Sequence, residues 1–187
     1  MIRIELLSEK NFQEHSLDSY VRRQDVRRVY RRKGDEYVLL DMPYVEDWSL
    51  EKKRQVASEI RGAEYIAYVA LEDDAVVGFI GLKKQLHEAY MILDLMHVSA
   101  AYRGKGIGRA LFRLGKEEAK KAGAKALYIS ACASEETIAF YRAMGAELTN
   151  HPIQEIADEE PYDLQMVCRV EQNGTSPERM LFPAETI

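Results

Sequence analysis

One stretch of the chain constrains its fold more than any other. It begins with a predicted strand at Tyr90–Val98, which leads through a glycine-rich turn into a helical pattern over Gly104–Ala122. A second strand is predicted directly afterwards, at Ala126–Ala131. The helical pattern has apolar residues recurring at spacings of three and four. Two strands joined by a helix in this way run parallel, with a right-handed crossover. Ligands of such sheets bind at the carboxyl ends of the parallel strands. We therefore expect a functional site directly after the first strand.

The rest of the periodicity predicts an α+β fold with one parallel pair in an otherwise mostly antiparallel sheet, flanked by about four helices. Short separations predict an antiparallel meander of Tyr65–Leu71, Val76–Leu82 and Tyr90–Val98. Further strands are expected at Ile2–Leu7 and Asp163–Val170, and helices at Ser49–Arg61 and Ser134–Met144. Helical character is predicted over Ser8–Gly34 with a cap at Ser16, an irregular stretch from Met42 to Trp48, and a loop over 150–163.

Composition narrows the class of protein. The 187 residues predict a single domain, over residues 1–170, with a tail at 171–187. Hydrophobic residues make up 47% and charged residues 30%, which is typical of a globular chain, and the net charge of −5 disfavours a nucleic-acid binder. Two cysteines, Cys132 and Cys168, form neither a disulfide framework nor a zinc pattern, and no metal site is expected. The start MIRIELLSEK has no leader pattern and no apolar run could span a bilayer, so we expect a cytoplasmic protein that does not bind membranes.

The turn before the helix carries the chemistry. Glycines alternate at 104, 106 and 108, although each costs a helix about 1 kcal/mol relative to alanine. Bare backbone N–H groups at a helix N-terminus bind anions, and Arg103, Lys105 and Arg109 add positive charge. The spacing is neither that of a dinucleotide fold nor that of a P-loop. A diphosphate site is one interpretation; a turn that merely permits close packing is the other.

The spacing Arg103-x-x-Gly106-x-Gly108 resembles the pyrophosphate-binding motif of the GNAT superfamily of N-acetyltransferases. The predicted strand at 127–131 resembles the family's next strand, and Phe140–Ala146 resembles its following helix and turn. The likeness extends over Glu64–Leu148 and is strongest to bacterial members. It implies a GNAT fold, acetyl-CoA as co-substrate, and direct transfer of an acetyl group to a primary amine of a small molecule or a protein. Dimers are common on this fold, so a homodimer stays an open alternative.

The resemblance also implies where acetyl-CoA is held. Backbone groups at the end of the strand pair with the pantetheine arm, the turn wraps the pyrophosphate, and two residues of the next helix touch the cofactor. The implied set is Met96, His97, Val98, Arg103, Gly104, Lys105, Gly106, Ile107, Gly108, Arg109, Ser134 and Tyr141.

Three residues are candidates for catalysis. The resemblance implies that Tyr141 assists the leaving thiolate, which suits a phenol with a pKa near 10; a packing role is the alternative. The amine must lose a proton, and Asp94 is the first candidate base, with His97 second. Side chains alternate along a strand, which would put Asp94 and Met96 on one face of the sheet and His97 on the other. A bulge would change this arrangement, and the resemblance implies a bulge in this strand.

Two charged segments remain. The arginine-rich Arg22–Lys33 helix is either an anion or nucleic-acid patch or a solvated face paired with acids. The acidic segments Glu46–Trp48 and Glu159–Asp163 attract a cationic amine or are simply surface acidity. Two other functions therefore stay open: a non-catalytic acyl-CoA-binding or sensing protein on the same fold, and a nucleic-acid-binding module built on the arginine helix.

Overall fold

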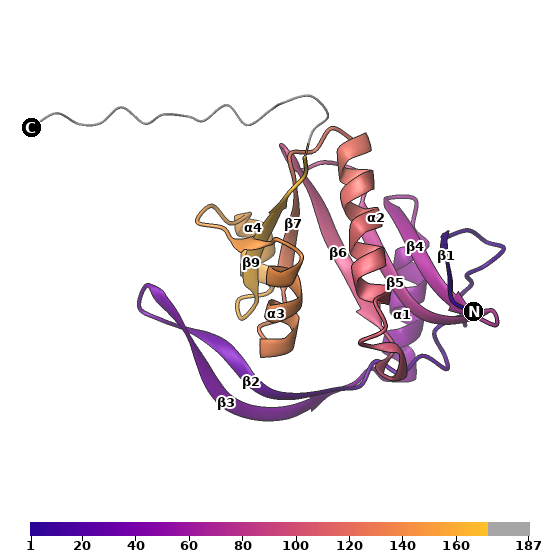
Figure 1. Ribbon diagram of the computed structural model, residues 1–187, viewed down its shortest axis with the longest axis horizontal. Coiled ribbons are helices and arrows are strands. Elements are labelled where there is room, and N and C mark those ends of the chain that lie inside the picture. Colours follow the sequence, from indigo (N-terminus) through magenta and orange to yellow (C-terminus); the bar gives the residue numbers. More distant parts are fainter. Residues whose placement is uncertain (172–187) are drawn as a thin grey trace, which may run out of the picture.

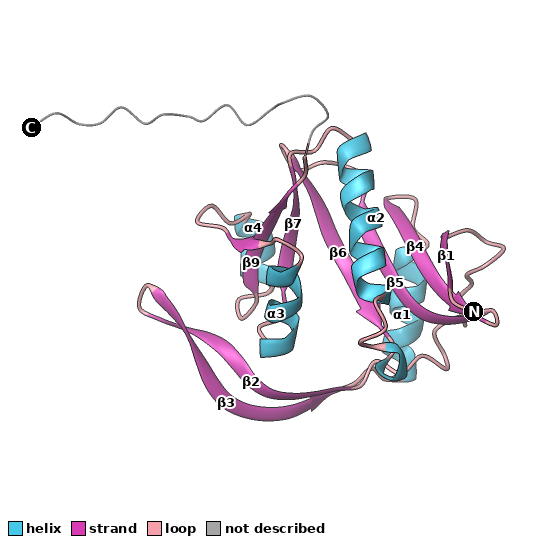
Figure 2. Cartoon of the chain, in the orientation of Figure 1, coloured by secondary structure: helices cyan, strands magenta, loops and turns pink. Residues whose placement is uncertain are grey.

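The structure, a computed structural model, describes residues 1–171; most of the predicted tail therefore lies outside the described residues. Within them the chain builds a seven-stranded sheet in the order β1-β4-β5-β6-β7-β9-β8 (Figures 1 and 2). The strands are β1 Arg3–Leu6, β4 Tyr65–Glu72, β5 Ala75–Lys83, β6 Tyr90–Val98, β7 Ala126–Ala131, β8 Glu147–Leu148 and β9 Leu164–Arg169. Neighbours pair antiparallel except β6 and β7, which are parallel. The predicted fold class is confirmed.

Helices cover both faces of this sheet. They are α1 Leu50–Ile60, α2 Ile107–Lys121, α3 Glu135–Ala143 and the short α4 Gln154–Glu159, with a 3-10 turn at Ala100–Tyr102. Serines at 49 and 134 cap α1 and α3 as N-cap residues do, with their hydroxyls accepting backbone N–H groups. Gly123 ends α2 with a φ of +76°. The helix α4 lies where a loop was predicted.

Two apolar cores lie on opposite faces of the sheet. Under α2 and α3, the first core joins Ile80, Leu111 and Ile129. Under α1, the second core joins Ile60, Val69 and Phe79. Because both faces are covered, the central strands are nearly continuous apolar runs, and any opening between strands connects the two faces.

The prediction for Ser8–Gly34 is wrong. The arginine-rich segment is a strand, β2 Gln24–Lys33, paired with β3 Glu36–Glu46 in a two-stranded hairpin. Gly34 and Asp35 form its two-residue turn, in which Gly34 has a φ of +65°. The irregular stretch predicted from Met42 is equally wrong, since β3 continues to Glu46. Local periodicity misleads here because the strand is stabilised by its partner and a bulge interrupts its alternation.

The hairpin arches past the carboxyl ends of β6 and β7 toward α3 (Figure 1). It docks there through a bridge between Val29 and Ser134 and a hydrogen bond from the Tyr30 N–H to the Ala133 carbonyl (2.8 Å). Two arginines of the segment that was predicted to be helical are paired: Arg28 donates to Glu135 (2.8 Å), and Arg23 donates to Asp25 (2.8 Å). The helix on which a nucleic-acid-binding module was to rest therefore does not exist.

Candidate functional site: a cleft where the parallel strands separate

The parallel strands separate before they end. Their pairing covers only Tyr90 to Leu93 on β6, opposite Ala126 to Ile129 on β7. Residues 94–98 have β5 on one side and no β7 partner on the other, while the end of β7 pairs with β9. A cleft of about 1020 Å³ occupies this separation. Strand edges with unpaired N–H and C=O groups accept an extended chain, as the resemblance implied for pantetheine.

The cleft reaches both faces of the sheet. From the α2 and α3 side it is lined by Met96, Gly108 and Phe140, and a Cβ on Gly108 would lie within 4 Å of both other side chains. From the α1 side it is lined by His97 and Trp48, whose rings lie edge to face at 4.6 Å. A donor on one face and an acceptor on the other can therefore meet in the separation.

The glycine turn at the start of α2 has the geometry of an anion-binding loop. Gly104 and Gly106 have φ values of +76° and +84°, and Gly106 is the N-cap, with no side chain capping the helix. A Cβ at either position would meet nothing within 4 Å, so backbone conformation, not packing, requires glycine there. At Gly108 a Cβ would lie 3.3 Å from the Phe140 ring. The close-packing explanation therefore applies to Gly108 alone of the three.

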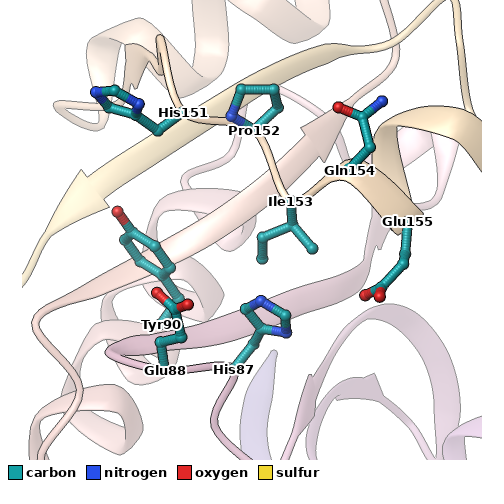
Figure 3. A pocket seen from close by; sticks show the side chains of 8 residues that line it. All are labelled: His87, Glu88, Tyr90, His151, Pro152, Ile153, Gln154 and Glu155. Atoms are coloured by element: carbon teal, nitrogen blue, oxygen red, sulfur yellow. The ribbon is translucent and has the colours of Figure 1, made fainter.

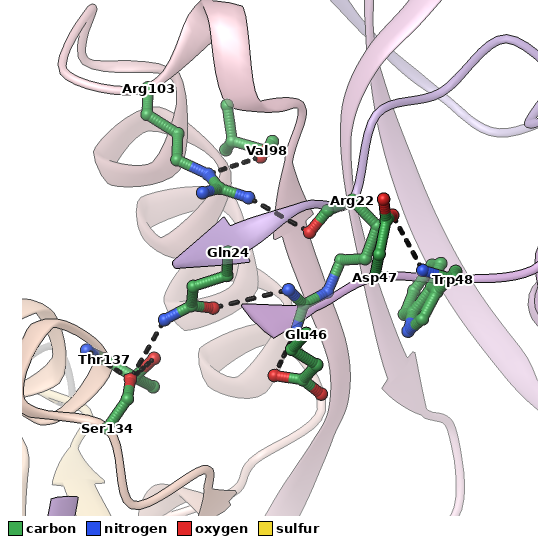
Figure 4. A network of polar contacts seen from close by, with 9 residues as sticks. All are labelled: Arg22, Gln24, Glu46, Asp47, Trp48, Val98, Arg103, Ser134 and Thr137. Carbon is green, nitrogen blue, oxygen red and sulfur yellow. Dashed lines mark hydrogen bonds and ion pairs between the residues drawn. The ribbon is translucent and has the colours of Figure 1, made fainter. Parts of the chain in front are cut away.

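Most of the implied cofactor residues line the cleft: Met96, His97, Val98, Arg103, Gly104, Gly106, Gly108, Arg109 and Tyr141. Ile107 is buried in the core and Lys105 lies over the Tyr102 ring at 4.7 Å, which leaves their backbones to contact a ligand. The Arg103 guanidinium donates to the backbone carbonyls of Val98 (3.0 Å) and Arg22 (3.3 Å), fastening the start of the hairpin to β6 (Figure 4).

The structure does not bring Ser134 to the cleft. This residue is fully buried, and its hydroxyl caps α3 and accepts a hydrogen bond from the Gln24 amide (3.0 Å). Gln24 in turn accepts from the guanidinium of Arg22 (3.3 Å) (Figure 4). Thr137, one turn further along α3, lines the cleft instead. No local pattern could have indicated this network, because Gln24 and Ser134 are 110 positions apart in the chain.

Tyr141 lines the cleft from α3. Its side chain packs on Phe112 and Phe140 and is 8% exposed, and its hydroxyl has no hydrogen-bond partner within residues 1–171. Burial, and after it the negative charge of Asp163, raises the pKa of Tyr141. The phenol therefore keeps its proton at neutral pH and can donate a hydrogen bond to a ligand.

Asp94 lies at a β-bulge. The register places Leu95 opposite Gly81 and Leu93 opposite Leu82, so Asp94 is the extra residue, at the position where the resemblance implied a bulge. Its carboxylate accepts from the Tyr65 hydroxyl and lies 3.7 Å from the Lys83 ammonium. Burial, followed by the bond to Asp94, raises the pKa of Tyr65. Asp94 lines the cleft, yet its carboxylate is already held by two partners on the α1 side.

His97 shares the α1 side with Asp94, as expected with a bulge. Its ring packs on Trp48 and Phe79. Burial, and then the positive charges of Arg22 and Arg103, lowers the pKa of His97 well below its usual value, so the ring is neutral at physiological pH.

The two acidic segments meet at the β7 end of the cleft. Glu46 comes from β3, and Glu160 and Asp163 come from the segment between α4 and β9. Asp163 accepts from Ser130 (3.4 Å), and burial, followed by Glu160, raises the pKa of Asp163 to about 7. Burial also raises the pKa of Cys132 nearby, so that thiol stays protonated and is a poor nucleophile.

A second pocket, of about 330 Å³, lies between the turn before β6 and the start of α4 (Figure 3). His87 and His151 flank it, but no group of three or more His, Cys, Asp or Glu side chains within residues 1–171 is arranged to hold a metal ion. No helix over the same residues is long and apolar enough to span a membrane.

Comparison with known proteins agrees with this geometry. Residues 24–146 match the acetyltransferase (GNAT) family, and the chain belongs to that family. Solved structures with the same fold include nourseothricin acetyltransferase, at 18% identity and a TM-score of 0.71, covering 91% of this chain and 99% of that one. A Bacillus anthracis protein described as a streptothricin acetyltransferase, solved with acetyl coenzyme A, has 19% identity and a TM-score of 0.70 over 91% and 99%. An aminoglycoside 6'-N-acetyltransferase complexed with coenzyme A has 18% identity and a TM-score of 0.53 over 66% and 82%. No curated protein sequence matches the chain.

Proposed function

We propose that this protein is an N-acetyltransferase that moves an acetyl group from acetyl-CoA directly to a primary amine. The observation that carries the proposal is the juxtaposition of a strand edge without a partner and an uncapped glycine turn on the same cleft. Family membership supports acetyl transfer as the chemistry and acetyl-CoA as the donor. The solved relatives named for streptothricin and aminoglycoside acetylation favour amine acceptors as the first to test.

Each part of the cleft has a role in this reaction. The N–H groups of the 104–108 turn bind the pyrophosphate, and the free edge of 96–98 aligns the pantetheine arm. Acetyl-CoA supplies the thioester carbonyl that the amine attacks. The Tyr141 hydroxyl donates a hydrogen bond to the departing sulfur, which stabilises the charge that develops there.

The first experiment is thermal unfolding with acetyl-CoA, free CoA and NADH. Ligand at about one hundred times its Kd stabilises the folded state by about 2.7 kcal/mol, which raises the Tm of a chain of this size by roughly 5–10 °C. We expect this rise with both CoA forms and none with NADH. Thiol release is then followed with streptothricin, kanamycin and spermidine as acceptors.

Substitutions at two glycines separate binding from backbone strain. Gly106→Glu places a carboxylate in the turn and is expected to abolish the rise with acetyl-CoA. Gly123→Glu introduces the same left-handed strain at the other end of α2, away from the cleft, and is expected to preserve the rise. If wild-type protein shows no rise, the donor assignment is wrong. A rise without thiol release from any amine would support the non-catalytic acyl-CoA-binding alternative.

A further inference from the structure

The β7 end of the cleft holds three carboxylates from segments far apart in the chain. Glu46 ends β3, Glu160 follows α4, and Asp163 precedes β9. Of the positive groups on the same cleft, Arg103 and Arg109 lie at the glycine turn, and the Arg22 guanidinium lies 3.2 Å from the Glu46 carboxylate. The cleft is therefore positive at the glycine turn, and within residues 1–171 the carboxylates without an arginine partner at its β7 end are Glu160 and Asp163.

Asp163 is the carboxylate that interacts electrostatically with Tyr141, a residue that lines the cleft and whose hydroxyl has no hydrogen-bond partner in the described part of the chain. Side chains alternate along β7, so Ser130 points away from the core that contains Ile129 and Ala131, and Asp163 bonds to Ser130 on that opposite face. Asp163 therefore lies on the face of the sheet opposite α2.

A chain of hydrogen bonds fixes the Asp163 carboxylate. Ser130 donates to Asp163 (3.4 Å) and accepts from the Gln165 amide (2.9 Å). The Gln165 oxygen accepts from the buried Tyr128 hydroxyl (2.7 Å), which itself accepts from the Ile153 N–H (2.9 Å). The charged groups that face Asp163 are Glu160 and Glu46, and neutral Tyr141 and Cys132 lie close by.

We propose that this acidic end is the acceptor site for a cationic amine, and that Asp163, not Asp94, is the base that deprotonates its ammonium group. The inference rests on the proposed function and names the substrate class and the base for it. Asp94 is held by the Tyr65 hydroxyl and the Lys83 ammonium, whereas the side-chain partners of Asp163 are a neutral hydroxyl, that of Ser130 at 3.4 Å, and the carboxyl of Glu160. Glu160 attracts the cation and holds a further ammonium group of the same molecule, whereas Glu46 is already paired with Arg22 at 3.2 Å.

Every proton in the reaction is accounted for without a further reactant. Asp163 takes one proton from the ammonium group, and the freed nitrogen lone pair forms the bond to the acetyl carbon. The carbon–sulfur bond breaks, and the sulfur leaves with the second nitrogen proton while Tyr141 donates its hydrogen bond. Asp163 then returns its proton to solvent. The elevated pKa of Asp163, about 7, suits a base working at neutral pH.

The test compares Asp163→Asn with Asp158→Asn, a matched change on the exposed side of α4. With the acceptor that wild-type protein acetylates fastest among streptothricin, kanamycin and spermidine, Asp163→Asn is expected to lower kcat/KM by about 10²–10⁴-fold and to remove the limb of the pH profile that rises near pH 7. Asp158→Asn should retain both. The rise in Tm on adding acetyl-CoA should be the same for wild type and both variants.

Substrate class is tested with 1-aminobutane, which lacks a second cation. Wild-type protein should favour spermidine by more than tenfold in kcat/KM, and Glu160→Gln should shrink that preference. If Asp94→Asn removes the rising limb and Asp163→Asn retains it, the base assignment is overturned. Wild-type protein that binds acetyl-CoA yet neither binds nor acetylates any cationic amine overturns the acceptor assignment alone. Failure of the proposed function can be told apart from failure of this inference, because acetyl-CoA would then stabilise neither the wild-type protein nor any of the variants.

Discussion

Alanine at Gly106 should destabilise the fold through backbone strain alone. Gly106 has a φ of +84°, and a Cβ there would meet no atom within 4 Å. The left-handed conformation costs an L-residue roughly 1–2 kcal/mol, and no contact offsets it. For a chain of this size, each 1 kcal/mol lowers the Tm by about 2–4 °C, so the expected loss is roughly 2–8 °C.

Two other glycines, Gly108 within α2 and Gly123 just after it, supply the controls. Gly123 has a φ of +76° and equally open surroundings, so Gly123→Ala should cost the same. Gly108 has no positive φ, so alanine there would stabilise the helix by up to about 1 kcal/mol through its higher helix propensity. The added Cβ would lie 3.3 Å from the Phe140 ring, which must shift slightly. Gly108→Ala should therefore leave stability within about 1 kcal/mol of wild type.

Urea unfolding measures all three variants, and acetyl-CoA titration accompanies it. Gly106→Ala should weaken acetyl-CoA binding while Gly123→Ala does not, since only Gly106 lines the cleft. The reasoning fails if Gly106→Ala is as stable as wild type, or if Gly108→Ala is the least stable of the three. Either result would mean that the turn does not have the left-handed backbone that exposes its N–H groups.

Three further outcomes are expected. Tyr141→Phe should lower kcat by about tenfold or more at unchanged affinity for acetyl-CoA, and full activity in steady-state thiol release would refute the donor role. Ser134→Ala removes the α3 cap and should lower the free energy of unfolding, measured in urea, by about 0.5–2 kcal/mol. If this free energy is unchanged and the affinity for acetyl-CoA is tenfold weaker, Ser134 contacts the cofactor as the sequence resemblance implied. Burial lowers the pKa of His97, so the unfolded chain binds the proton more tightly than the folded protein does. The free energy of unfolding of wild type should therefore fall, relative to that of His97→Gln, by up to about 1.4 kcal/mol for each pH unit below 6.5. A difference that does not depend on pH would contradict a buried, neutral ring.

The central βαβ unit and the glycine turn are predictable from sequence because their signals are local. Apolar periodicity over Gly104–Ala122, the serine caps of α1 and α3, and the glycines of the turn each describe interactions within a few residues. The hairpin is not predictable in that way. Val26 and Val29 are buried by residues distant in the chain, and the bulge between Val26 and Arg28 spaces them as a helix would.

The candidate site divides along the same line. The glycine turn and Tyr141 lie in continuous motifs, so the sequence by itself determined the family and indicated acetyl-CoA as the donor, and it predicted the roles proposed for the turn and for Tyr141. It also identified both acidic segments without being able to say that they meet. Only the tertiary structure brought Glu46 beside Asp163, held Asp94 with Tyr65 and Lys83, and buried Ser134. The physical reason is that desolvation and charge pairing, which decide which carboxylate can act as a base, depend on neighbours that folding supplies from across the chain.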